Sequence, residues 1–181
     1  MVSFSLPKGV VPGNVRIIMV CEAMPDNPAD YFYTSSNSLY VTNTIDAFNS
    51  AGIKVNSIDE ILKKGVYLTV AVKTARTGPT VPPDVIEEHS HTLEKEIGQF
   101  PNVKAILLMG DAAIRALNCI SKRKYSMKAI PAGSTYKIRK DKFYFNDIRA
   151  FPSYLQTGKN FLIEKAKQRM VAEDIKNAFL V

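Results

Sequence analysis

Residues 15–40 read VRIIMVCEAMPDNPADYFYTSSNSLY and join an apolar run to a polar loop that is rich in aromatic residues. The run from Val15 to Val20, broken only by Arg16, is typical of a strand buried in a sheet. In α/β sheets, ligands bind where the carboxyl ends of strands open into loops. This loop offers four aromatic rings and one amide to such a ligand: Tyr31, Phe32, Tyr33, Tyr40 and Asn37. It favours a planar, polar ligand such as a nucleobase; the alternative is a rigid connector whose rings cap the core.

The rest of the chain alternates strands with helices. Further strands are expected at 66–72, 103–109 and 147–153, and helices at 43–52, 57–64, 84–100, 112–120 and 160–180. A hairpin is expected where residues 136–139 and 143–145 flank a polar tip. This order predicts one α/β domain over residues 1–181, with a mostly parallel sheet covered on both faces.

Composition narrows the class of protein. An apolar share of 46% and a charged share of 23% are ordinary for a soluble globular domain. The apolar runs are too short to cross a bilayer, no signal peptide is evident, and the two cysteines are expected to be reduced, so a cytoplasmic protein is expected. The net charge of +7 and the pI near 9.4 favour a nucleic-acid partner.

No cofactor, no metal and no obligate protein partner are expected. His89 and His91 lie two residues apart on a predicted helix, so they cannot share a face to hold a metal ion. No Gly-x-Gly-x-x-Gly motif follows any predicted strand, which argues against a dinucleotide site.

Three stretches, taken in order, resemble the uracil-DNA glycosylase superfamily, in particular its mismatch-type and hypoxanthine-type DNA glycosylases. They lie within residues 24–40, 107–113 and 132–155. The first resembles the family's post-strand loop, the second its strand that runs through a glycine into a helix, and the third its final hairpin and Pro-Ser loop. The resemblance implies a three-layer α/β/α sandwich with a mostly parallel four-stranded sheet. It also implies hydrolysis of the N-glycosidic bond of a deaminated or mismatched base in DNA.

The chain departs from the family at three motif positions. Ala23 or Met24 stands where many members carry a catalytic acid or amide, Val70 where an asparagine often reads uracil, and Phe151 where His or Asn is common. Hypoxanthine-type members also lack the first-motif acid, and there the resemblance gives more weight to the asparagine that matches Asn37.

The expected roles follow from glycosidic cleavage of a flipped base. Phe32 or Tyr33 would stack on the base, in a pocket that includes Ala23, Met24 and Val70. Asn37 would orient water or contact the base, and Glu22 is the carboxylate with general-base potential. The alternatives are that Asn37 only holds its loop and that Glu22 points to solvent or pairs with a lysine.

The expected DNA contacts lie near strand ends. Leu155 matches the family's apolar wedge, while Pro152 and Ser153 would position a phosphate. Further candidates for phosphate contacts are basic: Arg149, Lys159, Arg76 and Lys73. The alternatives are a leucine packed under its loop and solvated surface charges.

Three hypotheses therefore stand at this point. The first is a divergent DNA glycosylase, and the second is a nucleic-acid-binding protein that has lost the chemistry. The third is a hydrolase or transferase that acts on free nucleosides or other small ligands in the same pocket.

Overall fold

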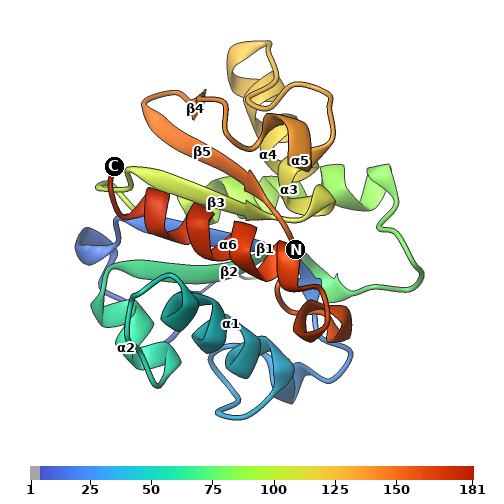
Figure 1. The fold of residues 1–181 in the computed structure, drawn as a ribbon. Helices are drawn as coiled ribbons and strands as arrows, with labels where there is room; N and C mark the ends of the chain where they lie inside the picture. The colour runs from blue at the N-terminus through green and yellow to red at the C-terminus, as the bar shows by residue number, and fades with distance from the viewer. Residues whose placement is uncertain (1–4) are drawn as a thin grey trace.

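The computed structural model describes residues 5–181 as an α/β fold around one sheet (Figure 1). Its strands are β1 (Ile17–Met24), β2 (Val66–Ala75), β3 (Ala105–Met109), β4 (Phe143–Phe145) and β5 (Ile148–Ser153). They lie in the order β2-β1-β3-β5-β4, and only the edge strand β4 runs antiparallel to its neighbour. The expected α/β class and mostly parallel sheet are confirmed. The expected count of four strands is wrong, because β4 adds a fifth.

The central strand β1 is buried on both faces. Its neighbours β2 and β3 pair with it in parallel, with Ile17 opposite both Val66 and Ala105. Since side chains alternate across a strand, Ile18 and Val20 enter one apolar cluster while Ile17 and Met19 enter the other. This double burial explains why the strand reads as an almost unbroken apolar run.

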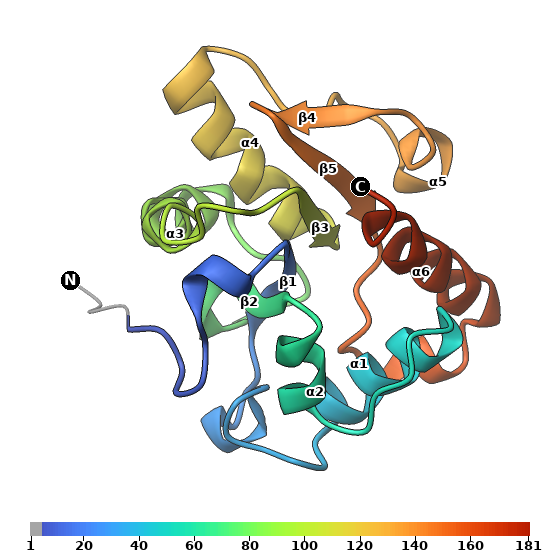
Figure 2. The same cartoon turned by 90° about the vertical axis from the view of Figure 1, so that its left-hand side faces the viewer.

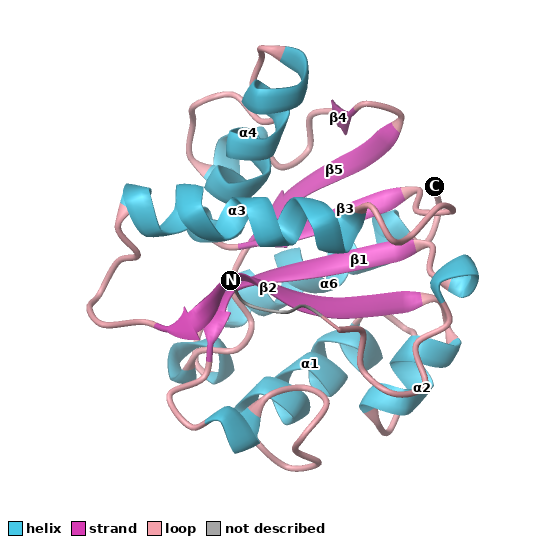
Figure 3. Cartoon of the chain, turned by 180° about the vertical axis from the view of Figure 1, so that it is seen from behind, coloured by secondary structure: helices cyan, strands magenta, loops and turns pink. Residues whose placement is uncertain are grey.

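Helices cover both faces of the sheet. On one face lie α3 (Pro83–Ile97) and α4 (Asp111–Tyr125), which pass in front of the strands in Figure 3. On the other face lie α1 (Leu39–Ser50), α2 (Ile58–Lys63) and α6 (Lys165–Ala178). A short helix, α5 (Thr135–Ile138), and three 3-10 turns at Pro12–Asn14, Pro28–Asp30 and Lys159–Leu162 complete the elements.

Helix α1 begins four residues earlier than expected. Ser38 is its N-cap, and the Ser38 hydroxyl accepts a hydrogen bond from the backbone N–H of Val41 at 3.4 Å. The earlier start moves Tyr40 from the loop into the first helical turn. The start of α2 is as expected, since the Ser57 hydroxyl accepts a hydrogen bond from the Glu60 N–H at 3.2 Å.

The expected hairpin has the wrong partner. Residues 135–138 form α5 rather than a strand, and β4 pairs instead with β5 across a turn at Asn146 and Asp147. Asn146 adopts a positive φ of 52°, which asparagine tolerates better than most residues. The observed turn at 146–147 follows residues 143–145 instead of preceding them, so β5 is both the last strand along the chain and the second arm of the hairpin.

Within residues 5–181, none of the helices combines the length and the apolar composition needed to span a membrane.

Candidate functional site

A cavity of about 380 Å³ opens at the carboxyl ends of β1 and β2. Its walls are the end of β1 with the loop that follows, the first turn of α1, and the loop at 155–159 after β5. Of the residues expected to form the site, six line this cavity: Glu22, Ala23, Met24, Arg76, Leu155 and Lys159. The hollow therefore lies between the first buried strand and the segment after the Pro-Ser motif, and Pro152 and Ser153 do not line it.

Three carboxylates line this cavity, those of Glu22, Asp26 and Asp30, and that of Glu22 is held in place by two contacts. Its Oε2 accepts a hydrogen bond from the backbone N–H of Ala112 at 2.8 Å, in the first turn of α4. Its Oε1 lies 3.7 Å from the guanidinium of Arg76, and the side chain is 16% exposed. The helix amide and the arginine therefore take the place of the solvent or lysine that the sequence left open as alternatives.

Gly110 makes room for this carboxylate. It has a φ of +107°, and a Cβ placed on it would lie 2.8 Å from both Cγ and Cδ of Glu22. A glycine between β3 and α4 therefore meets two demands, a backbone conformation that other residues avoid and the close approach of Glu22.

Tyr40 supplies an aromatic ring to the cavity. Its hydroxyl donates a hydrogen bond to the carbonyl of Ala23 at 2.7 Å, and the ring of Phe32 lies 5.4 Å from its own. Burial raises the pKa of Tyr40 from 10.0 to about 12, so the hydroxyl remains a donor well into the alkaline range. The sequence names this ring among the loop aromatics but not as a site residue; Ser38, a favourable N-cap, is the signal that places it on the helix.

The expected base-stacking residue, Phe32, lies in the interior, so that expectation is wrong. The side chain is 1% exposed and packs between Tyr31 and Tyr40. Val70 is fully buried in the middle of β2, within the apolar cluster under α1 and α2, and does not reach the cavity. Phe32 and Val70 both have apolar side chains, and both are buried in the core.

Tyr33 closes the edge of the sheet instead of lining the cavity. Its hydroxyl donates to the Leu68 carbonyl at 2.7 Å and accepts from the Leu68 N–H at 2.9 Å. Its ring stacks on that of Tyr67 at 6.0 Å. Burial raises the pKa of Tyr33 well above its ordinary value. The Tyr33 side chain thus satisfies the backbone carbonyl and N–H of Leu68 on edge strand β2.

Asn37 lies on the surface, in the loop before α1, and does not line the cavity. Its backbone N–H donates to the Ser35 hydroxyl at 3.2 Å. The alternative that Asn37 only holds its loop therefore fits the structure better than a role in orienting water or contacting a base. A different asparagine, Asn43, is buried and donates to the carbonyls of Gln156 and Gly158 at 2.9 and 3.3 Å. It ties α1 to the loop at the far wall of the cavity.

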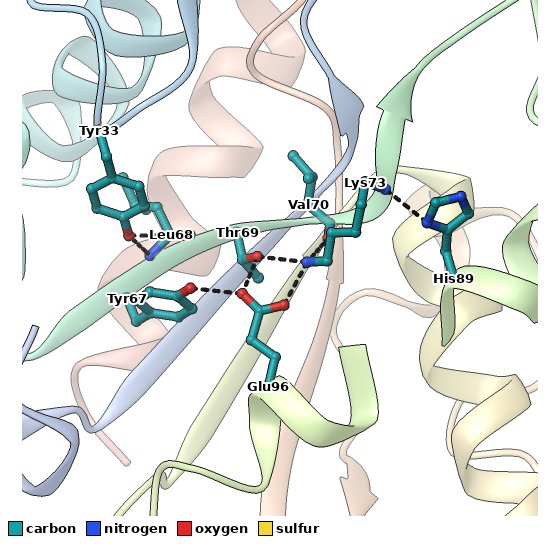
Figure 4. A network of polar contacts seen from close by, with 8 residues as sticks. All are labelled: Tyr33, Tyr67, Leu68, Thr69, Val70, Lys73, His89 and Glu96. Atoms are coloured by element: carbon teal, nitrogen blue, oxygen red, sulfur yellow. Dashed lines mark hydrogen bonds and ion pairs between the residues drawn. The ribbon is translucent and has the colours of Figure 1, made fainter. Parts of the chain in front are cut away.

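Lys73 is an internal residue, not a phosphate contact (Figure 4). Its Nζ lies 2.5 Å from Oε2 of Glu96, a side chain that is 1% exposed. Glu96 Oε1 also accepts hydrogen bonds from the hydroxyls of Tyr67, at 2.7 Å, and Thr69, at 2.5 Å. Burial lowers the pKa of Lys73, although Glu96 opposes that shift. This network joins β2 to α3, and a single lysine in the sequence gives no sign of it.

The remaining candidates on β5 also serve other purposes. Arg149 lies at the start of the strand, the end opposite the cavity, with its guanidinium 4.4 Å from the centre of the Phe151 ring. Pro152 is buried in β5, and Ser153 is 1% exposed and donates to Asp174 at 2.6 Å. Pro152 and Ser153 are not placed to contact a phosphate, because both are buried in β5, before the loop at 155–159 begins.

Among residues 5–181, no group of three or more His, Cys, Asp or Glu side chains is arranged to hold a metal ion. No protein-family model matches the chain, and no curated protein matches its sequence.

Proposed function

We propose that this protein is a DNA base-excision glycosylase with a three-layer sandwich of the uracil-DNA glycosylase type. It would hydrolyse the N-glycosidic bond of a deaminated or mismatched base. The observation that carries the proposal is the fixed carboxylate of Glu22 in a cavity whose opposite wall bears Leu155 and Lys159.

The size and walls of the cavity suit a single base. Its volume of about 380 Å³ lies at the small end of the range for ligand sites, about 300 to 1,000 Å³. Met24, Leu39, Tyr40 and Leu155 give it apolar surface, and Glu22 and Arg76 give it charge. An extruded base needs this combination of flat apolar contact with a few polar groups.

Glu22 would act on the sugar side of the bond. Cleavage builds positive charge on the sugar and negative charge on the departing base, and a preorganised anion stabilises the first of these. The same carboxylate could accept a proton from the attacking water. Arg76, within 3.7 Å of Glu22, would offset the charge of the departing base or bind a flanking phosphate.

A second candidate function is a nucleic-acid-binding protein without catalysis. It is favoured by the contacts of Glu22, because Ala112 and Arg76 already engage both carboxylate oxygens. The position of Asn37 outside the cavity favours it as well.

Oligonucleotides that each carry one uracil, hypoxanthine or xanthine separate these candidates. The glycosylase proposal expects alkali-labile strand cleavage for at least one lesion at enzyme excess. Glu22→Gln should reduce the rate by about 100-fold or more, the usual contribution of a positioned acid or base. Glu88→Gln, an exposed substitution on α3, is the matched control and should leave the rate unchanged.

Absence of base release from every lesion would reject the glycosylase. Tight, salt-sensitive binding of the same duplexes would then support the binding protein. Release of base from free nucleosides, without duplex binding, would instead support the small-ligand hydrolase.

A further inference from the structure

The positive charge of the chain gathers away from the candidate cavity. Two basic and three acidic side chains line the cavity. Figure 2 shows where α5, β4 and α6 lie in the fold. Residues of these elements line two other hollows, of about 570 and 700 Å³, which adjoin each other because they share Arg139, Lys140 and Glu173. Together these two hollows, called here the basic groove, are lined by three acidic side chains and six basic ones: Lys137, Arg139, Lys140, Lys142, Arg149 and Arg169.

One of these six basic side chains is part of the framework. Arg139 is 4% exposed and binds Asp174 at 2.8 Å and Glu173 at 2.7 Å, which fixes α5 against α6. Its charge is therefore neutralised within the protein. For the other five, no carboxylate of residues 5–181 lies within 4 Å. Arg149 donates hydrogen bonds to three backbone carbonyls at 3.1 to 3.4 Å, and a polyanion would supply charged partners for the other four.

The groove also presents flat groups for stacking. Tyr136 is 73% exposed and Tyr144 is 54% exposed, unusually high values for tyrosine rings. The guanidinium of Arg149 lies 5.7 Å from the Tyr144 ring and 4.4 Å from the Phe151 ring. Rings and guanidinium planes interleaved with lysines are the groups that bind unpaired bases and their phosphates.

We propose that the basic groove binds single-stranded nucleic acid. The phosphates would contact Lys140, Lys142 and Arg169, and bases would stack on Tyr136 and Tyr144. The groove follows α6 from Ala166 to Asn177, about 17 Å, which matches about five nucleotides stacked at 3.4 Å each. The proposal does not depend on base excision at Glu22, because the groove lies along α6 and at the opposite end of β5.

Fluorescence anisotropy with labelled dT20 tests the proposal. The triple variant Lys140→Gln, Lys142→Gln, Arg169→Gln should weaken binding at least tenfold. It should also make the slope of log affinity against log salt shallower by about 2, since each contact to a single strand contributes about 0.7. The control triple variant Lys54→Gln, Lys64→Gln, Lys95→Gln removes the same charge from exposed sites elsewhere and should stay within about twofold of the parent.

The tyrosines give the second readout. Tyr136→Ser with Tyr144→Ser should weaken dT20 binding by about tenfold without changing the salt slope, because stacking releases no counterions. Glu22→Gln should bind dT20 as the parent does, so this result stays separate from the test of excision. Three results would each overturn the proposal. The first is an equal loss of dT20 affinity in the groove triple variant and in the control triple variant. The others are unchanged affinity in the tyrosine double variant and tighter binding of a 20-base-pair duplex than of dT20.

Discussion

Glu22 and Gly110 show how two residues 88 positions apart define one corner of the cavity. The glycine is needed because the carboxylate occupies the space that a Cβ would fill, at 2.8 Å. The carboxylate in turn reaches the first turn of α4 only over that glycine. The geometry of the site therefore depends on a residue that has no functional group of its own.

Gly110→Ala should cost more stability than a positive φ alone explains. The backbone penalty is shared by Gly52→Ala, whose φ is +82° and whose Cβ would meet nothing within 4 Å. Both variants should lose about 1 kcal/mol or more from backbone strain, and Gly110→Ala should lose a further 1 to 3 kcal/mol from overpacking. Free energies of unfolding in urea measure both. Equal losses in the two variants would show that Glu22 moves aside without cost.

At the scale of single residues, the sequence predicts which residues lie near the cavity better than it predicts the direction in which their side chains point. Glu22 could be placed near the cavity because it lies at the carboxyl end of a buried strand, and Leu155 because it matches the apolar wedge of the family that the chain resembles. Phe32 and Asn37 could not be placed, because a loop's hydrophobic ring turns inward or outward according to its tertiary neighbours. Here the ring of Tyr40, not Phe32, faces the cavity, and the core takes Phe32.

At the scale of elements, strands β1 and β3 follow from their apolar runs, since only a strand buried on both faces carries such a run. The capping residues explain the beginnings of α1 and α2. The segment 136–139 was wrongly expected to be a hairpin strand, because four residues contain too little periodicity to separate a strand from a short helix. The network that holds α3 to β2 was equally hidden, because its β2 members are 23 to 29 residues away from Glu96 along the chain.

Glu96→Gln tests what that network contributes. The amide keeps the hydrogen bonds from Tyr67 and Thr69 within reach but removes the negative charge that lies 2.5 Å from the Lys73 ammonium. Loss of one partner of a buried pair costs about 3 to 5 kcal/mol of unfolding free energy. Lys73→Met combined with Glu96→Gln should recover much of that loss, and urea unfolding measures each variant.

The matched control is the exposed pair of Lys63 and Asp59 on α2, at 2.9 Å. Asp59→Asn should change the free energy of unfolding by less than about 1 kcal/mol, as exposed pairs do. A Glu96→Gln variant no less stable than Asp59→Asn would contradict a structural role for the buried pair.

At the scale of the whole molecule, the sheet separates two apolar layers, and each holds buried groups that ionise only at high pH. Burial raises the pKa of Cys21 from its ordinary value of 9.0 to about 12. Burial, reinforced by the charge of Glu96, raises the pKa of Tyr67 far above 10. The unfolded chain therefore loses these protons at a lower pH than the folded protein. The stability that they provide is complete below pH 9 and is lost progressively as the pH rises above it.

The free energy of unfolding should therefore fall more steeply with pH in the alkaline range. The variant Tyr67→Phe isolates the contribution of the Tyr67 hydroxyl to that fall. Between pH 10.5 and 11.5, the buried Lys73, whose folded pKa is lowered from 10.5, is present in both proteins, so its titration cancels when the parent and Tyr67→Phe are compared. In that window Tyr67 should contribute a loss of about 1.2 kcal/mol per pH unit, close to the limit of 1.36 for one proton. Tyr67→Phe should make the slope of unfolding free energy against pH shallower by that amount, whatever its effect on stability at pH 7.

Tyr144→Phe, at a surface position, should keep the parent slope. If the slopes of the parent and of Tyr67→Phe coincide, then the Tyr67 hydroxyl ionises as readily in the folded protein as in the unfolded chain, and the interior around β2 is open to water.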